Sequence, residues 1–473
     1  MNSQKNKFDS LVNKVVALMS DYLALNEDKD IHVLNYISGD DLLAQENFDL
    51  PEKGSSDEDL LLEEIKKYLK YSVRTSHPQF NNQLNGGFHL ASFVGEMISF
   101  LANTSMATYE IAPYATILER KLIEKLASLI GYKTFDGIMV TGGSNANLLA
   151  IHCARFKKNP EIKRKGMGSK KDFVVYVSEN SHYSFKKGMN LLGLGIDNIY
   201  PIKNDEHFRM SPEALEKAIE HTFELGKIPL MVASTAGTTV FGSFDPVIEI
   251  AKIAKKYDIW HHIDGAWGAP VLFSSKLKHL LAGSELSDSF TWDSHKLMGT
   301  GLITSFFLSR HENILREVNG GGGGSYIFHE YENAKFDFGP ASLQCGRKPD
   351  AFKLWLEWKD KGDQGFADLV EGQFAKMQFA LNFIKSHPRF ELVHEPTYLN
   401  LCFKVLPLDK EKYPDINQYN YDLRFKLMRS GRAMVNLSEL RTGDIFFRLV
   451  FANPATTEED LSSLFDILLE LAD

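Results

Sequence analysis

The pattern that most constrains the fold is an alternation of short β-rich runs with helical runs between about residue 90 and residue 310. The β-rich runs are GIMV, FVVYVS, LMVAST, IWHHI and FTW, and helical segments such as NANLLAIHCARF and PVIEIAKIAKKY separate them. Strands that alternate with helices build a mostly parallel central sheet with helices on both faces. The sequence therefore predicts an α/β fold.

The two ends of the chain predict smaller parts beside this sheet. Residues 1–90 carry helical periodicity interrupted by a polar loop, and we expect a helical arm that packs on a partner subunit. Residues 91–365 would form the large domain. Residues 366–473 combine long helical segments with the strand-like runs LNLCFKVLP and IFFRLVFANP, which predicts a small α+β domain.

The composition is that of a folded globular chain. Of its 473 residues, 44% are hydrophobic and 24% are charged, and the formal net charge is -9. An acidic balance without a long basic tract argues against nucleic acid or an anionic membrane as the main partner. No run approaches the roughly 18 uncharged apolar residues of a membrane span. The three cysteines are far apart and form no CxxC pair, which fits a cytoplasmic protein without disulfides or a metal site.

Polar residues follow five of the predicted strands where each strand ends. In open parallel sheets, ligands bind outside the carboxyl ends of the strands. In chain order these residues are Gly143 with Ser144, His182, Thr239, Asp264 and Lys296.

Each of these residues also has an ordinary structural explanation. Gly143 and Ser144 could form a tight turn, His182 could be a satisfied histidine, and Asp264 could cap a helix. Lys296 could pack its stem and extend its ammonium group to water. However, the apolar sequence around Lys296 would also favour a neutral amine, which is a nucleophile toward carbonyl groups.

One chemistry uses the whole set. Pyridoxal 5'-phosphate binds as a Schiff base to a lysine, with its phosphate at a helix N-terminus and its pyridinium nitrogen beside an aspartate. A protonated ring nitrogen lets the cofactor accept the electron pair that is left when a bond to the substrate's α-carbon breaks.

At this point the sequence resembles a known family. The motifs HPQFNNQLNGG, TGGSNAN, VSENSHYSFKKG, STAGTTVFGSFDP, WHHIDGAWGAP, TWDSHKLMG and FFRLVFANP follow in the order found in group II pyridoxal phosphate-dependent decarboxylases of fold type I. The likeness is to the branch that contains glutamate decarboxylase and cysteine sulfinate decarboxylase, and it runs from about residue 70 to the end. It implies a homodimer that decarboxylates an acidic L-amino acid, with glutamate, aspartate and cysteine sulfinate as the expected substrates.

The resemblance implies a role for each matching residue around the cofactor. Lys296 would bind the cofactor covalently, and Asp264 would pair with its pyridine nitrogen. Ala266 would underlie the ring and His182 would stack on its other face. The phosphate and the rest of the cofactor would lie near Gly143, Ser144, Thr239 and His295.

Four further positions would serve the substrate. Arg448 matches the arginine that binds the α-carboxylate, and its planar guanidinium suits bidentate recognition. Gln83 matches a contact to the distal acidic group, and Asn85 stands where better-known members carry a different pocket residue. Tyr326 matches the tyrosine that protonates the carbanionic intermediate, and it follows the flexible run Gly320–Gly324.

Departures from the family pattern leave the outcome open. Asp293 and Ser294 replace the usual Asn-Pro, and Ala107 replaces an aromatic residue of the substrate pocket, which implies a roomier or differently shaped pocket. An aminotransferase or an aldehyde synthase would use the same cofactor set. A catalytically inactive dimeric scaffold is the alternative outside enzymes, although the retained lysine, aspartate, histidine and arginine speak against it.

Overall fold

The structure, a computed structural model, describes residues 2–28, 30–55, 57–168 and 172–472. They form two compact units, each of which is described by itself. The first unit comprises Met1–Gln83, Lys376–Val393 and Leu401–Asp473, and the second comprises Leu84–Ala375 and His394–Asn400.

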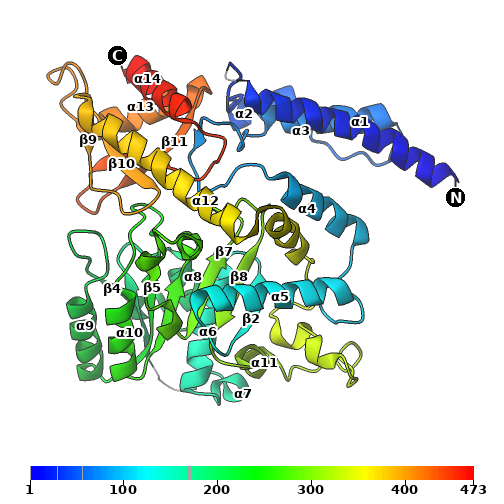
Figure 1. The fold of residues 1–473 in the computed structure, drawn as a ribbon, viewed down its shortest axis with the longest axis vertical. Helices are drawn as coiled ribbons and strands as arrows, with labels where there is room; N and C mark the ends of the chain where they lie inside the picture. Colours follow the sequence, from blue (N-terminus) through cyan, green and yellow to red (C-terminus); the bar gives the residue numbers. More distant parts are fainter. Residues whose placement is uncertain (1, 29, 56, 169–171, 473) are drawn as a thin grey trace. The chain divides into compact units, whose positions relative to one another are not determined.

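A seven-stranded sheet forms the centre of the second unit (Figure 1). Its strand order is β2-β8-β7-β6-β5-β3-β4, and every neighbouring pair is parallel except the two that involve β8. The strands are β2 (Asp136–Val140), β3 (Phe173–Ser178), β4 (Ile199–Ile202), β5 (Ile228–Thr235), β6 (Trp260–Asp264), β7 (Ser289–Asp293) and β8 (Ser305–Ser309). The predicted mostly parallel α/β fold is confirmed.

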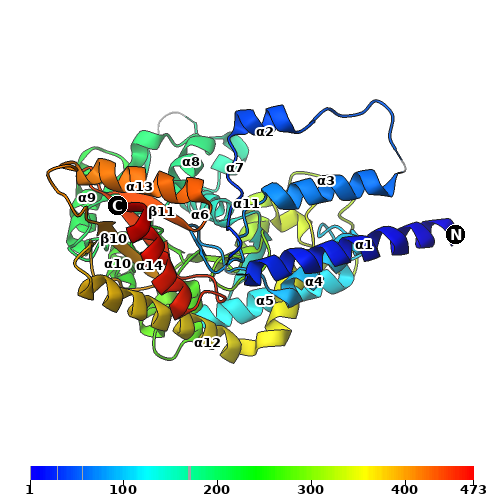
Figure 2. The same ribbon diagram turned by 90° about the horizontal axis from the view of Figure 1, so that it is seen from above.

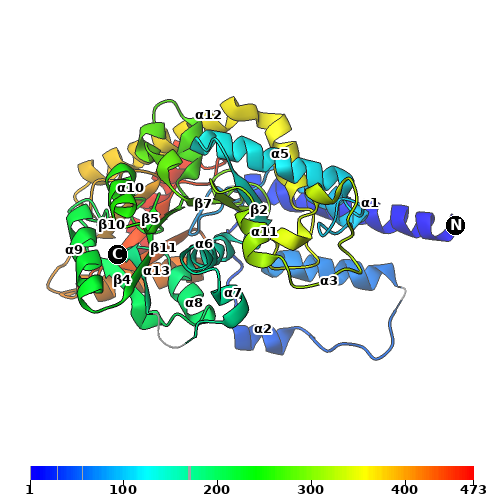
Figure 3. The same cartoon turned by 90° about the horizontal axis from the view of Figure 1, so that it is seen from below.

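Helices cover both faces of this sheet, with α6 and α8 on one face and α5 and α10 on the other (Figure 3). All residues of β3, β6 and β7 are buried, as expected for parallel strands packed on both faces. The helices of this unit include α4 (Leu90–Ala102), α5 (Pro113–Ile130), α6 (Gly143–Lys158), α7 (Ile162–Lys165), α8 (Ser184–Leu191), α9 (Pro212–Glu224), α10 (Val247–Lys256) and α11 (Ile314–Asn319).

Strands β3, β4 and β5 are each followed by an α-helix that returns the chain to the edge where the next strand begins. For example, Ser211 caps α9 by accepting a hydrogen bond from the Ala214 amide, and Pro212 opens the helix with a φ suited to its first turn. Short 3₁₀ helices complete the connections: η1 (Ile196–Asn198), η2 (Ala269–Phe273), η3 (Lys278–Leu281), η4 (Ser284–Leu286), η5 (Ala334–Phe336) and η6 (Gly339–Ala341). This winding places the carboxyl ends of β3, β5, β6 and β7 along one edge of the sheet.

The first unit contains a five-stranded sheet of order β1-β11-β12-β10-β9. Its strands are β1 (Phe80–Asn81), β9 (Phe390–Leu392), β10 (Asn400–Val405), β11 (Met434–Glu439) and β12 (Ile445–Val450). The two strands predicted near the C-terminus are present as β10 and β12. Because β1 pairs in parallel with β11, segments from both ends of the chain share this sheet.

Helices α1 (Asn2–Glu27) and α3 (Glu58–Tyr71), which we call the helical arm, lie side by side (Figure 2). Lys14 of α1 forms an ion pair with Glu58 of α3 at 3.1 Å. The other helices are α2 (Gly39–Gln45), α13 (Ile416–Ser430), α14 (Glu458–Ala472) and α12 (Ala351–Ser386), which is interrupted at Gly362. In the described part of the chain, no helix combines the length and apolarity needed to cross a bilayer.

Candidate active site

The carboxyl edge of the seven-stranded sheet opens into a cavity of about 260 Å³. Connections that follow β2, β3, β5, β6 and β7 supply its lining. All eight residues predicted to contact the cofactor line this one cavity, although they come from five separate stretches of sequence. They are Gly143, Ser144, His182, Thr239, Asp264, Ala266, His295 and Lys296.

The carboxylate of Asp264, which is 5% exposed, is held in a fixed orientation. Its Oδ2 accepts a hydrogen bond from Asn147 Nδ2 at 2.8 Å, and its Oδ1 accepts one from the Ala266 amide at 3.2 Å. The Asn147 side-chain oxygen in turn accepts a hydrogen bond from the Thr291 hydroxyl at 2.8 Å and lies 3.0 Å from His262 Nε2. This network fixes the Asn147 amide so that its NH₂ group points at Asp264.

His262 is fully buried, and burial lowers its pKa to about 3, so its imidazole is neutral. Its Nε2 carries the hydrogen, since that nitrogen faces the carbonyl oxygen of Asn147. Its Nδ1 accepts a hydrogen bond from the Ser289 hydroxyl at 2.8 Å, and the Ser289 oxygen accepts one from Trp260 Nε1. In this series of hydrogen bonds, each residue therefore donates to the next one in the direction of Asp264.

Lys296 has an anionic partner inside the cavity. Its Nζ lies 3.2 Å from Oδ2 of Asp293, a carboxylate that is almost completely buried. The surroundings of the amine thus differ from the apolar ones expected from sequence, because the turn after β7 brings the side chain three residues earlier against Nζ. The Asp293 carboxylate also lies 3.9 Å from His295 Nε2.

The two predicted histidines are both partly buried, and burial lowers the pKa of each. The Ser184 amide donates to Nδ1 of His182, so the neutral His182 ring carries its hydrogen on Nε2. Tyr183 covers one side of this ring, with ring centroids 4.1 Å apart. His295 Nδ1 lies 3.2 Å from both the amide nitrogen and the carbonyl oxygen of Thr304. Backbone groups therefore set the orientation of both imidazoles.

Comparison with known proteins identifies the family to which this chain belongs. Residues 40–406 match the model of the pyridoxal-dependent decarboxylase conserved domain, which is most of the chain. The chain belongs to the pyridoxal-dependent decarboxylase family. The decarboxylase is 37% identical over 434 residues to cysteine sulfinic acid decarboxylase of Rattus norvegicus, covering 90% of this chain and 88% of the relative.

Solved structures agree with this assignment. The crystal structure of mouse CSAD matches with a TM-score of 0.95 and 33% identity, covering 98% of each chain. Rhodiola rosea 4-hydroxyphenylacetaldehyde synthase matches with a TM-score of 0.86 and 23% identity, covering 100% of this chain and 98% of its own, which shows a shared fold. The predicted group II membership, in the glutamate and cysteine sulfinate decarboxylase branch, is confirmed. The decarboxylase is a pyridoxal phosphate-dependent amino acid carboxy-lyase.

The cavity of the decarboxylase fits pyridoxal phosphate. Gly143 opens α6, and a Cβ on this glycine would approach Asp293 Oδ2 to 2.7 Å, so only glycine leaves the helix N-terminus clear. Among the described residues, no side chain caps that N-terminus, which leaves backbone amides for a phosphate. Thr235 Oγ1 lines the cavity, is buried, and has no partner among the described residues. One feature departs from this fit, because the Asp293 carboxylate places negative charge beside the glycine turn.

None of the four residues predicted to serve the substrate is among the residues that line this cavity. Tyr326 is 80% exposed in the glycine-rich loop after α11. Asn85 accepts a hydrogen bond from the Gly87 amide, and its neighbour Gly86 packs so closely that a Cβ there would lie 2.5 Å from the Lys296 carbonyl oxygen. Gln83 is exposed, and it is the last residue of the segment Met1–Gln83 of the first unit.

Arg448 lies in β12 of the first unit, where it is largely buried. Its Nη2 donates a hydrogen bond to the Asn82 carbonyl oxygen at 2.6 Å. Burial lowers the pKa of the Arg448 guanidinium.

Sequence reasoning missed Asn147, Tyr183, Thr235 and Trp267, which also line the cavity. Asn147 carried a usable signal, because it lies four residues after Gly143 and therefore on the same face of the same helix. The buried His262 also escaped notice, although it is two residues before Asp264.

Proposed function

We propose that the decarboxylase acts on an acidic L-amino acid, namely glutamate, aspartate or cysteine sulfinate, and releases the corresponding amine and carbon dioxide. The observation that carries the proposal is the convergence of Lys296, Asp264 and His182 on one cavity. The acidic substrate is supported by the 37% identity to a relative named cysteine sulfinic acid decarboxylase.

The residues of the cavity divide the work of holding the cofactor. Lys296 Nζ would bind the cofactor aldehyde, and the Asp264 carboxylate would keep a proton on the ring nitrogen. Ala266 and His182 would enclose the ring, while Gly143, Ser144, Thr239 and His295 would contact the phosphate end. When bound, pyridoxal phosphate supplies an electron sink for the pair left as the bond to the carboxylate breaks.

The residues of the chain itself orient the charged groups of the cavity and determine which side-chain atoms carry hydrogens. Hydrogen bonds from Asn147 and from the Ala266 amide hold the Asp264 carboxylate in one orientation. His182 is neutral and carries its hydrogen on Nε2, which can therefore donate a hydrogen bond toward the cofactor or the substrate. We assign Tyr326 as the donor that protonates the α-carbon, since its glycine-rich loop allows the tyrosine to move.

Substrate selection would rest on residues outside the cofactor contacts. Arg448 would bind the α-carboxylate, and its guanidinium is already oriented by the Asn82 carbonyl oxygen. Gln83 and Asn85 would contact the side chain of the substrate. The close packing of Gly86 on the Lys296 turn supports this role for Asn85, which is the preceding residue.

A cytoplasmic homodimer is the proposed state of the protein. Helix α4 exposes Leu90, Phe100 and Leu101, apolar side chains that a second copy of the chain would cover. The helical arm likewise exposes Phe8 of α1 and Tyr68 of α3. None of the three cysteines, all of which belong to the described residues, forms a disulfide, as suits a reducing compartment.

A panel of L-amino acids, tested for pyridoxal phosphate-dependent release of carbon dioxide, tests this function. We expect release from one or more of the three acidic substrates and at least about tenfold lower kcat/KM for aromatic amino acids, because the site is proposed to pair with a distal anion. Keto acid production would instead indicate an aminotransferase, and peroxide with aldehyde would indicate an aldehyde synthase. Absence of turnover across the panel would contradict the proposal.

A further inference from the structure

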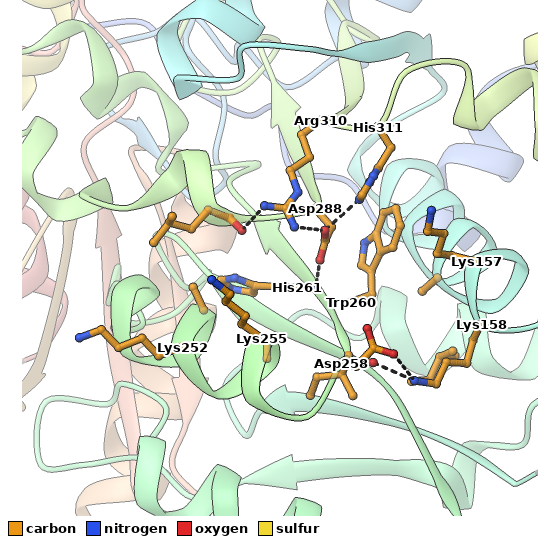
Figure 4. Close-up of a pocket in the computed structure, with 16 residues that line it drawn as sticks. Lys157, Lys158, Lys252, Lys255, Asp258, Trp260, His261, Asp288, Arg310 and His311 are labelled. Atoms are coloured by element: carbon orange, nitrogen blue, oxygen red, sulfur yellow. Dashed lines mark hydrogen bonds and ion pairs between the residues drawn. The ribbon is translucent and has the colours of Figure 1, made fainter.

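A second and larger cavity lies at the opposite edge of the seven-stranded sheet, which we call the amino edge because the parallel strands begin there. It has a volume of about 610 Å³ and is shown in Figure 4. Trp260 and His261 at the start of β6 contribute to its lining, together with Arg310 after β8 and the last turns of α6 and α10. None of these residues lines the cavity around Lys296.

The charge of this basic cavity opposes that of the whole chain. Five Lys and Arg residues and two Asp residues line it, although the net charge of the protein is -9. Both carboxylates already have cationic partners. Lys158 Nζ lies 3.2 Å from Asp258 Oδ2, and Arg310 Nη2 lies 2.5 Å from Asp288 Oδ1.

Three lysines of the cavity remain uncompensated. They are Lys157 of α6 and Lys252 and Lys255 of α10, and all three are exposed. Their ammonium groups have neither a hydrogen bond nor an ion pair with another residue in the described part of the chain. Three lysines from two helices therefore contribute positive charge to the lining of one cavity, without an anionic partner among the described residues.

The lining of the cavity also contains an unpartnered polar group. His261 is 1% exposed, and its Nε2 lies 2.7 Å from the Ser234 hydroxyl. Its Nδ1 is buried and has no partner among the described residues. Burial lowers the pKa of His261 to about 4, so the ring is neutral and Nδ1 can carry the hydrogen while Ser234 donates to Nε2. A buried donor of this kind is normally satisfied by a bound molecule or water.

Stabilisation of helix ends explains only part of the cluster. Lys157 and Lys255 lie in the last turns of their helices, where a cation interacts favourably with the helix dipole. Lys252 lies before the last turn of α10, and Arg310 belongs to no helix. Helix dipoles also do not account for a hollow of this size or for the unpartnered nitrogen of His261.

We propose that the basic cavity is a binding site for a small anion that carries two or more phosphate groups. Lysine ammonium groups bind phosphate oxygens as mobile point charges, and three of them match an anion of multiple charge. The volume lies within the range of roughly 300 to 1,000 Å³ that is typical of small-molecule sites. The site is separate from the decarboxylation chemistry and does not depend on the identity of the substrate.

Calorimetric titration of the cofactor-loaded protein with sodium tripolyphosphate, at constant ionic strength, tests the proposal. We expect one saturable site per chain, with the cofactor absorbance unchanged. The double variant Lys252→Gln/Lys255→Gln should weaken binding at least about tenfold, because two charge-assisted contacts are lost. The matched control Lys133→Gln/Lys217→Gln removes the same charge from exposed positions outside the cavity and should stay within about twofold of wild type.

Three results would overturn the proposal. The first is an absence of saturable binding to the wild-type protein. The second is an equal loss of affinity in both double variants, which would indicate general electrostatic attraction. The third is release of the cofactor during the titration, which would place the anion at the carboxyl edge. The single variant Lys157→Gln, on the other helix, provides an independent check and should weaken binding about threefold or more.

Discussion

At the carboxyl edge of the central sheet the charged groups are paired and oriented by the protein, whereas at the amino edge three lysines have no partner in the described part of the chain. Lys296 lies against Asp293, and Asp264 is held by Asn147. Lys252 and Lys255, by contrast, are exposed residues of α10 in the lining of the basic cavity, and neither has a fixed contact with another described residue. The difference separates two uses of charge: fixed groups suit bond-breaking chemistry, while mobile cations suit recognition of a charged ligand.

Strand β6 connects the two edges. His261 and His262 are neighbours on this strand and therefore point to opposite faces, one toward the basic cavity and one toward Asn147. A chain of hydrogen bonds runs from Trp260 at the amino edge through Ser289, His262 and Asn147 to Asp264. The same strand thus supplies parts of both cavities.

The strongest test of the paired edge is the replacement Lys296→Ala. We expect decarboxylation to fall by roughly 10⁴-fold or more, because the covalent anchor of the cofactor is lost. The absorbance of the lysine-bound cofactor should disappear while the circular dichroism spectrum stays native. Lys278→Ala, at an exposed lysine outside both cavities, serves as the control and should retain both signals.

Replacement of the other fixed charge should have the next largest effect. Asp264→Asn keeps the shape of the side chain but removes the charge that would hold a proton on the ring nitrogen. We expect kcat to fall roughly 10²- to 10³-fold, as for the loss of a central electrostatic group. A loss of less than threefold in steady-state assays would show that this carboxylate does not serve the reaction.

Acid should destabilise the strand that joins the edges. His261 and His262 have native pKa values lowered to about 4 and about 3, so their neutral forms contribute stability above the unfolded pKa near 6.5. That stability is lost as pH falls below about 6.5, because the unfolded chain then binds more protons. From pH 7 to pH 5 each histidine should lower the free energy of unfolding by about 2 kcal/mol.

Urea unfolding at the two pH values measures this effect. His262→Gln, whose amide can still donate to Asn147, should remove about 2 kcal/mol of the pH-dependent loss. The exposed variant His279→Gln provides the control. Identical pH dependence in wild type and His262→Gln would refute a neutral, buried His262.

The smallest expected effect concerns the hydrogen bond that orients Asp264. Asn147→Ala should lower kcat by roughly tenfold, since a buried carboxylate loses one donor while its charge remains. Ser184→Ala is the matched control, because Ser184 accepts a hydrogen bond from Asn147 and has none with Asp264. If both variants lose activity equally, Asn147 acts through local packing rather than through Asp264.

The carboxyl edge could be predicted from sequence because each of its groups directly follows a recognisable strand. Lys296 after β7 and Asp264 at the end of β6 follow the general rule for ligand sites in parallel sheets. The role of Asn147 could not be predicted from sequence. It depends on contacts of this α6 residue with His262 of β6 and Thr291 of β7.

The amino edge gave no sequence signal, since its lysines lie on helices almost one hundred residues apart. Lys157 and Lys252 each look like ordinary solvated helix residues when they are considered alone. Only the return of α6 and α10 to the same edge of the sheet brings them together. The pairing of β1 with β11 escaped prediction for a related reason, because two-residue strands carry no periodicity.

Chemical trapping of the cofactor tests the central claim most directly. Borohydride reduces a carbon–nitrogen double bond between an aldehyde and a lysine to a stable amine, and peptide mass spectrometry then locates the modified residue. The account predicts that pyridoxal phosphate is found on Lys296 at the carboxyl edge. Modification of a lysine of the basic cavity, such as Lys252, with Lys296 left unmodified would contradict it.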